Sequence, residues 1–201
     1  LVATPIGNLS DISERALKVL SEVDFIAAED TRNSLRLLTH FGISKPLVSY
    51  FEHNKRERGP QIIKRLQGGE SCALITDAGT PAISDPGEDL VRLCAENGVK
   101  VTSVPGACAA ITALTLSGFD TRRFVFEGFV SGTKSEIDAH LTPLKNEKRT
   151  MIFYEAPHRL VDTLEVFYSH FGDRKIALCR EITKLNEEVK RVKLSEALDY
   201  Y

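Results

Sequence analysis

The 201-residue sequence lacks the motifs by which several classes of protein are most readily identified. No apolar run approaches the roughly 18 residues of a membrane-spanning helix, and no secretory signal is visible. Neither GxGxxG, GxxxxGK[ST] nor GxSxG occurs, which removes the main support for NAD binding, P-loop nucleotide binding and serine hydrolysis. Internal repeats and low-complexity segments are also absent.

Cysteine and net charge exclude further classes of site. The four cysteines form no CxxC pair, which predicts reduced, mostly packed thiols in a cytoplasmic protein. The formal net charge of −2 gives the chain no overall attraction to nucleic acid, so any such binding relies on local patches. Asp85, Glu88 and Asp89 are better explained by a helix start than by a cation, so no metal site is predicted.

Short apolar runs alternate with amphipathic helical segments, a pattern typical of α/β folds with mostly parallel strands. The expected strands cover residues 1–4, 25–28, 46–51, 71–76, 99–104, 124–129, 150–154 and 175–180. The expected helical segments cover residues 5–23, 29–42, 54–69, 86–98, 105–118, 134–146 and 157–170. The polar stretch FDTRR after Gly118 sets the predicted boundary between two small α/β domains, 1–118 and 119–201. We expect a mainly parallel sheet in the first domain, a mixed sheet in the second, and a second domain that is truncated at its carboxyl end.

Unusual loops follow the expected strands, where ligands bind in open α/β sheets. They are ATPIGN (3–8), EDTR (29–32), FEHN (51–54), TDAGTPAISDPG (76–87), VPGACAA (104–110) and YEAPHR (154–159). Gly79 and Gly106 are expected to let a ligand approach the backbone, so Gly79→Val should abolish cofactor binding and leave the fold largely intact. In any one of these loops, glycine and proline could equally serve only to form the turn between two elements. Six loops at equivalent strand ends predict one ligand site.

The motifs VATPIGNLSDIS, AAEDTR, ITDAGTPAISDPG, VPGACAAITAL, FYEAPHR and CREITKLNEE occur in this order across the chain. Together they resemble the bacterial ribosomal RNA small-subunit methyltransferase I family of the tetrapyrrole methylase superfamily. The resemblance implies a homodimer that transfers a methyl group from S-adenosyl-L-methionine to the ribose 2′-hydroxyl of a cytidine in 16S ribosomal RNA. It also implies a cofactor cleft between the two domains. A tetrapyrrole or precorrin methyltransferase and a non-catalytic adenosyl-ligand binding module remain alternatives.

Two segments depart from the patterns of the superfamily. Tetrapyrrole-methylating members usually carry a GxGxGD-like first loop, where this chain has TPIGN. This departure weakens the tetrapyrrole alternative. The RNA enzymes generally show a basic LPRK-like run after FEGF, where this chain has residues 130–134, VSGTK.

The resemblance also assigns residues to roles. The implied cofactor contacts are Ile6, Asp77, Ala78, Gly79, Thr80, Ile83, Pro105, Gly106, Ala107, Cys108, Ala109, Tyr154 and Glu155. The implied substrate contacts are Arg32, His53, Asn54, Arg58, His158 and Arg159.

A ribose hydroxyl needs a base to share its proton. The catalytic candidates are Asp30, Asp77, Glu155 and Lys184, the last only if burial suppresses its charge. His53 and His158 are further candidates, although surface exposure or capping competes with catalysis for both. Asp30 and Arg32 could equally form a structural ion pair. The basic run NKRERG (54–59) is, without the resemblance, usually a solvated helix face.

Overall fold

The computed structural model describes all 201 residues, which form two compact units, Leu1–Cys108 and Ala109–Tyr201. The units therefore divide after residue 108 and not, as expected, after residue 118. The reason is helix α5 (Ala109–Ser117), which packs against strands of the second unit. The change of composition at FDTRR marks the end of this helix and not the boundary between the units.

The first unit is built on a parallel sheet with strand order β2-β1-β3. The strands are β1 (Phe25–Ala28), β2 (Leu47–Ser49) and β3 (Cys72–Ile75). The expected strands at residues 1–4 and 99–104 are extended segments joined by a single parallel bridge between Val2 and Val104. Val2 N donates to Leu74 O at 3.0 Å, and Val104 N donates to Leu1 O at 2.9 Å. The first segment thus lies between β3 and the segment around Val104.

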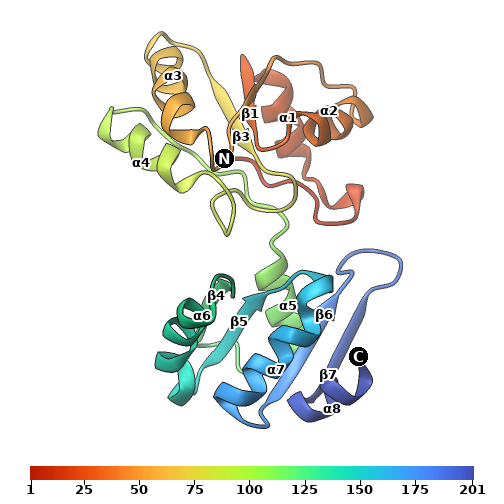
Figure 1. Cartoon of the computed structure of the whole chain (residues 1–201). Helices are drawn as coiled ribbons and strands as arrows, with labels where there is room; N and C mark the ends of the chain where they lie inside the picture. Colours follow the sequence, from red (N-terminus) through yellow and green to blue (C-terminus); the bar gives the residue numbers. More distant parts are fainter. The chain divides into compact units, whose positions relative to one another are not determined.

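Helices cover both faces of this sheet (Figure 1). In chain order they are η1 (Leu9–Asp11), α1 (Glu14–Glu22), α2 (Thr31–His40), α3 (Lys55–Gln67) and α4 (Glu88–Glu96). Side chains of β1 alternate between the two layers: Ile26 packs in the cluster that contains Leu20 of α1, and Phe25 in the cluster that contains Ile62 of α3. A strand buried on both faces is typical of parallel α/β sheets.

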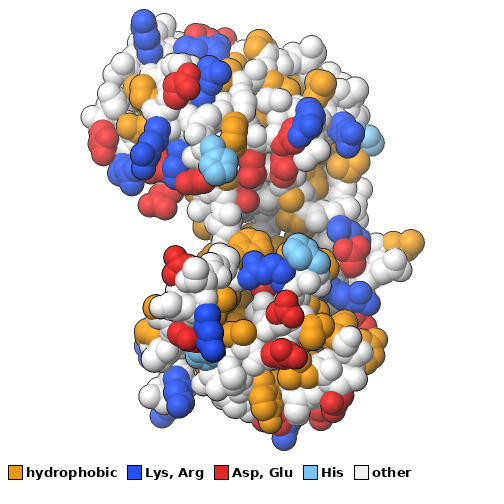
Figure 2. Space-filling model, viewed as in Figure 1, with side chains coloured by type: hydrophobic (Ala, Val, Ile, Leu, Met, Phe, Trp, Pro, Cys, Tyr) orange, Lys and Arg blue, Asp and Glu red, His pale blue; other side chains and the backbone are white.

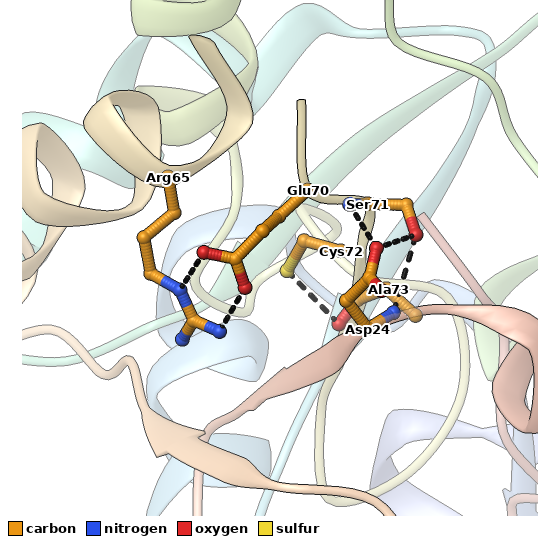
Figure 3. A network of polar contacts seen from close by, with 6 residues as sticks. All are labelled: Asp24, Arg65, Glu70, Ser71, Cys72 and Ala73. Atoms are coloured by element: carbon orange, nitrogen blue, oxygen red, sulfur yellow. Dashed lines mark hydrogen bonds and ion pairs between the residues drawn. The ribbon is translucent and has the colours of Figure 1, made fainter. Parts of the chain in front are cut away.

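The end of this sheet where β1 and β3 begin is closed by a polar network (Figure 3). Ser71 donates from its backbone N and its Oγ to Asp24 Oδ2, each at 2.7 Å. Arg65 near the end of α3 donates from Nε to Glu70 at 2.9 Å, and its guanidinium lies 3.4 Å from the ring centroid of Phe25. A ligand site on this sheet is therefore expected at the opposite end, where the strands finish.

The second unit contains a parallel and an antiparallel strand pair. Parallel strands β4 (Phe124–Phe129) and β5 (Thr150–Tyr154), together with β6 (Lys175–Arg180), match the expected strands residue for residue. The antiparallel partner of β6 is β7 (Glu188–Lys193), which was not expected, and neither was α8 (Leu194–Tyr200). The remaining helices are α6 (Lys134–Leu141), η2 (Thr142–Asn146), η3 (Pro157–Arg159) and α7 (Leu160–Phe171).

The core of the second unit includes Leu164 of α7, which packs with Leu194 and Ala197 of α8. The α/β class, with a parallel sheet in the first unit and both strand directions in the second, is confirmed. None of the helices combines the length and the apolar character that crossing a bilayer would require.

Candidate functional site

The loops at the carboxyl ends of the first unit's strands surround a pocket of about 290 Å³. Three segments line it: residues 4–7 and Leu9 of the first loop, the α2 residues Asn33, Ser34 and Leu37, and residues 76–78 after β3. The expected cofactor residues Ile6, Asp77 and Ala78 are among the lining residues. The strand ends therefore bring together motifs that are up to about seventy residues apart in the sequence.

The loop 76–87 is fixed to its neighbours by hydrogen bonds. Thr4 N donates to Gly79 O at 2.9 Å, and Gly79 N donates back to Thr4 O at 3.0 Å. Thr80 Oγ1 donates to Ala107 O at 2.9 Å. The loop that follows β3 is therefore tied both to the first loop and to the segment after Val104. Such a preformed loop loses less conformational freedom when a ligand binds.

Packing within the fold explains why glycine stands at the two positions that were expected to admit a ligand. Gly79 is buried and has φ of +85°, and a Cβ there would lie 3.2 Å from Ile6 Cγ2. A Cβ on Gly106 would lie 2.9 Å from Ala3 Cβ. Close packing between loops therefore requires glycine at both positions, whether or not a ligand binds. Gly79→Val should therefore also destabilise the fold, because a valine would strain the backbone and displace Ile6.

Carboxylates gather at the same edge of the sheet. Glu29 directly follows β1, and its carboxylate accepts from Asp77 N at 3.3 Å. Asp77 Oδ2 in turn accepts from Asn33 Nδ2 at 3.0 Å. Burial raises the pKa of Glu29, and burial together with the charge of Glu29 raises the pKa of Asp85 to about 6. The edge is therefore acidic and holds two carboxyl groups that ionise less readily than usual.

Sequence reasoning named Asp77 but missed Glu29 and Asn33, and it interpreted Asp85 only as a helix-start residue. A signal for Glu29 was present, because a carboxylate that directly follows a wholly apolar strand must lie at the strand's carboxyl end. The approach of Asp77 to Glu29 depends on how the loops pack. The separation of Asp77 and Glu29 in the sequence does not predict this contact.

Asp30 and Arg32 form the structural ion pair that was the alternative to a catalytic role for Asp30. Asp30 is the N-cap of α2 and accepts from Arg32 N at 2.8 Å. Its two oxygens also accept from Arg32 Nε at 3.1 Å and from Nη2 at 2.7 Å. These bonds lower the pKa of Asp30 to about 2. A carboxylate with so low a pKa is a poor acceptor for a ribose proton.

Lys184 does not meet the condition set for it. It lies in the turn between β6 and β7, where its Nζ is 2.9 Å from Glu181 Oε1. The side chains of Lys184 and Glu181 are 45% and 44% exposed, so the burial that a catalytic role required of Lys184 is missing.

The motif YEAPHR forms a locally bonded turn after β5. Glu155 Oε1 accepts from Ala156 N at 2.7 Å, and Oε2 accepts from the hydroxyl of Thr163. Arg159 donates from Nη2 to Val130 O, and its Nε lies 3.7 Å from Glu155 Oε1. Both side chains are therefore engaged within the unit, while His158 is exposed.

Tyr154 occupies a different position, beside the first turn of α5. Its hydroxyl accepts from Ala110 N at 3.0 Å, and its ring packs against Phe126 and Phe129 with centroids 5.1 and 5.4 Å away. The expected cofactor residue Ala109 begins this helix, and Pro105–Cys108 precede it. Ile83 is exposed in the loop after β3.

Two of the three substrate candidates after β2, Asn54 and Arg58, are bonded to neighbouring residues. Asn54 Oδ1 accepts from Phe51 N at 2.8 Å, and its Nδ2 donates to Ser49 O at 3.2 Å. Arg58 Nη1 donates to Gln61 at 2.8 Å, while His53 is exposed. Figure 2 shows basic and acidic side chains intermixed over the face of each unit. Any attraction for phosphate is consequently local.

Comparisons with known proteins agree with this arrangement. A protein of Pseudomonas aeruginosa named ribosomal RNA small subunit methyltransferase I is 52% identical over 201 residues, which are 100% of this chain and 71% of that protein. A protein of Thermotoga maritima with the same name is 45% identical, over 100% of this chain and 90% of that protein. The sequence-based resemblance to this methyltransferase family is confirmed.

Solved structures share the fold at much lower identity. A diphthine synthase superposes with a TM-score of 0.72 at 18% identity, covering 98% of this chain and 83% of that one. A cobalt precorrin-4 methyltransferase superposes with a TM-score of 0.70 at 16% identity, covering 99% and 88%. The family model for tetrapyrrole (corrin/porphyrin) methylases matches residues 1–198. The chain therefore belongs to the tetrapyrrole (corrin/porphyrin) methylase family.

Proposed function

We propose that the chain transfers a methyl group from S-adenosyl-L-methionine to the ribose 2′-hydroxyl of a cytidine in 16S ribosomal RNA. The observation that carries the proposal is the identity of 45–52% along essentially the whole chain to proteins named ribosomal RNA small subunit methyltransferase I. The family membership supports the methyl transfer itself. The nucleotide and the oxygen that receive the methyl group rest on the resemblance of the motifs.

The acidic edge of the sheet suits such a cofactor. S-adenosyl-L-methionine carries positive charge on its sulfur and its amino group, and Glu29, Asp77 and Asp85 are the carboxylates at this edge. Within the first unit, Ile6 and the residues 77–80 would hold it, and the resemblance of the motifs adds the other implied cofactor contacts. The group supplies an electrophilic methyl on a sulfonium, so the protein's main task is to orient the acceptor hydroxyl.

Among the four catalytic candidates, Asp77 is the one we propose as the proton acceptor. Asp30 is held by Arg32, both oxygens of Glu155 accept local hydrogen bonds, and Lys184 is paired with Glu181 in the turn between β6 and β7. Asp77 is exposed, lines the pocket, and is oriented by Asn33. Its carboxylate would take the ribose proton as the oxygen attacks.

Asp77→Asn and Asp30→Asn provide a matched test of this role. Asparagine at residue 77 keeps an oxygen for Asn33 but removes the base, so kcat should fall about 100-fold or more. Asparagine at residue 30 remains a good N-cap, and kcat should change less than about threefold. Single-turnover methylation of small ribosomal subunits measures both variants. Equal losses would exclude Asp77 as the specific base.

Calorimetric titration with S-adenosyl-L-methionine and its demethylated product measures whether the chain binds the cofactor. Binding of neither compound would contradict the proposal. Binding without turnover on ribosomal subunits or RNA would favour the non-catalytic binding module. Turnover on a precorrin instead would identify a tetrapyrrole methyltransferase. The homodimer and the cytoplasmic location are further proposals that rest on the resemblance, and light scattering and cell fractionation test them.

A further inference from the structure

Basic side chains gather at the end of the second unit where its strands begin. Residues 120–123, 145–149 and 173–175 lead into β4, β5 and β6, and they contain seven basic and three acidic side chains. The whole chain has 26 basic and 28 acidic residues, so this excess of positive charge is local. Six of the seven basic residues are exposed, and Arg174 is half-buried. We call these three segments the amino-end surface.

Hydrogen bonds hold the three segments of the amino-end surface against one another. Thr150 Oγ1, at the start of β5, donates to Asp120 O at 2.7 Å. Arg174 Nη2 donates to Glu147 O at 3.1 Å. The segments are up to about fifty residues apart in the sequence, but these two bonds make them neighbours in space. Their charges therefore act on the same partner.

The carboxylates of the amino-end surface already have basic partners. The N···O distances are 3.1 Å for Asp120–Arg122, 2.6 Å for Glu147–Arg149 and 3.7 Å for Asp173–Lys193 at the end of β7. Glu196 of α8 also lies beside Lys193 and accepts from its backbone N at 2.8 Å. The cations that form no ion pair are Arg123, Lys145, Lys148 and Lys175. These four exposed cations are free to bind an anion.

The arrangement of these cations suits an extended polyanion better than a single small anion. They come from three separate segments and are not gathered around one pocket. Phe124, which directly follows Arg123, is 37% exposed although it is aromatic. Exposed rings among cations are the surfaces on which unpaired nucleotide bases stack while the cations contact the phosphates. RNA supplies both kinds of group.

We propose that the amino-end surface binds the ribose-phosphate backbone of small-subunit RNA, with an unpaired base stacked on Phe124. This inference rests on the proposed function and adds to it a second place of contact with the substrate. The motif YEAPHR follows β5 at its carboxyl end, whereas the amino-end surface lies where β5 begins. The RNA bound here is therefore a different part of the substrate from the nucleotides that YEAPHR would contact.

An anionic lipid surface is the competing partner for these cations. Protein segments that lie on a bilayer usually insert several large apolar side chains beside their basic residues. Within the amino-end surface and the strand residues that follow it, Phe124 is the large apolar side chain that is exposed. A single ring serves base stacking but gives little insertion into lipid, so the observations favour RNA.

Two lysine pairs provide a matched test. Lys148→Ala with Lys175→Ala removes two free cations of the amino-end surface. Lys64→Ala with Lys100→Ala removes two exposed, unpaired lysines of the first unit and changes the net charge equally. Filter binding to protein-free 16S ribosomal RNA is measured at several salt concentrations, and affinity for S-adenosylhomocysteine is measured as a check on folding.

The first pair should weaken RNA binding about tenfold at 0.1 M salt. The slope of the logarithm of affinity against the logarithm of salt concentration should also become less steep by about 1.5. The second pair should change RNA affinity less than about twofold. Affinity for S-adenosylhomocysteine should be unchanged in both.

Phe124→Leu tests the stacked base separately from the charges. Leucine keeps an apolar side chain at the start of β4 but removes the flat ring. RNA affinity should fall about fivefold to tenfold, while the salt slope stays the same because no cation is lost. Tyr168→Leu, which removes a 44% exposed ring from α7, is the matched control and should leave RNA affinity unchanged.

Other outcomes contradict the proposal. Equal losses from the two lysine pairs, or an unchanged salt slope in the first pair, would show that the amino-end surface does not bind RNA. Flotation with phosphatidylglycerol vesicles that is lost in the first pair, with RNA affinity intact, would assign the surface to a membrane. RNA affinity is measured without methyl transfer. A protein that binds RNA as described but methylates no ribosomal subunit would therefore overturn the proposed function alone.

Discussion

At the scale of single residues, the loop 76–87 concentrates unusual backbone. Gly79, Ala82, Ser84 and Gly87 all have positive φ, with values of 85°, 70°, 58° and 149°. Two of these residues carry side chains and tolerate the left-handed region only at a cost of roughly 1–2 kcal/mol each. Hydrogen bonds to Thr4 and Ala107 hold the loop in this form. The rest of the first unit therefore maintains the shape of the loop.

Gly79→Ala and Gly42→Ala separate backbone strain from packing. Both glycines have positive φ, but a Cβ on Gly42 meets nothing within 4 Å, whereas one on Gly79 lies 3.2 Å from Ile6. Gly42→Ala should lower the free energy of unfolding by about 1–2 kcal/mol. Gly79→Ala should lower it by about 2–4 kcal/mol, because Ile6 must also move. Urea unfolding measures the difference between the two variants. Equal losses would show that displacing Ile6 costs no measurable free energy.

Asp85→Asn should stabilise the protein at neutral pH. The folded state raises the pKa of Asp85 from 3.8 to about 6, chiefly through burial. The folded state therefore binds the proton more tightly than the unfolded state, and stability is lost as the pH rises from about 4 through about 6. Asparagine removes this loss. After allowance for partial exposure, the gain in unfolding free energy should be about 1–2 kcal/mol above pH 7 and near zero below pH 4.

Thermal unfolding across this pH range tests the prediction. Asp162→Asn, which replaces an exposed carboxylate on α7, is the matched control and should change little over the range. A gain from Asp85→Asn that does not vary with pH would mean that ionisation of Asp85 is not its source.

At the scale of elements, α5 joins its unit through a side chain of β5. The Tyr154 hydroxyl accepts from Ala110 N, one of the amides of the first turn that have no partner within the helix. The helix sequence AAITALTLS has no polar face, so its sequence does not show which sheet the helix covers. For this reason the unit boundary could not be placed from the sequence.

Tyr154→Phe should lower the free energy of unfolding by about 1 kcal/mol, because it removes the partner of Ala110 N and keeps the ring packed. Tyr168→Phe is the matched control, since Tyr168 is 44% exposed on α7, and it should change stability by less than about 0.5 kcal/mol. Denaturant unfolding compares the two variants. An equal effect would mean that the bond to α5 contributes nothing.

The elements differ in how far the sequence predicts them. The bounds of β1, β4, β5 and β6 follow from short apolar runs between polar residues, and local composition is enough to find them. The segments 1–4 and 99–104 have strand-like sequences but pair at only one bridge, which depends on how their neighbours are placed. In the site, Asp77 could be found through its motif. The contact between Asp77 N and Glu29 could not, because it depends on tertiary packing.

At the scale of the whole molecule, mixed surface charge limits electrostatic attraction to RNA. The net charge is −2 and several basic side chains are already paired to carboxylates, so only local groups of cations can attract phosphate. We expect about 2–4 phosphate contacts from this chain. The logarithm of the affinity for small ribosomal subunits should then fall with the logarithm of salt concentration with a slope of about −2 to −4. Filter binding at several salt concentrations measures it, and a slope steeper than about −6 would contradict the expectation.

The position of residues 1–4 bears on the order in which the first unit assembles during translation. These residues leave the ribosome before the rest of the first unit, yet Val2 pairs on one side with β3 and on the other with Val104. The nascent chain must therefore keep an apolar segment unpaired until β3 has emerged about seventy residues later, and its second side unpaired until Val104 has emerged. Pairings so distant along the chain slow folding. The emerging segment is consequently the part of the first unit most in need of a chaperone during its synthesis.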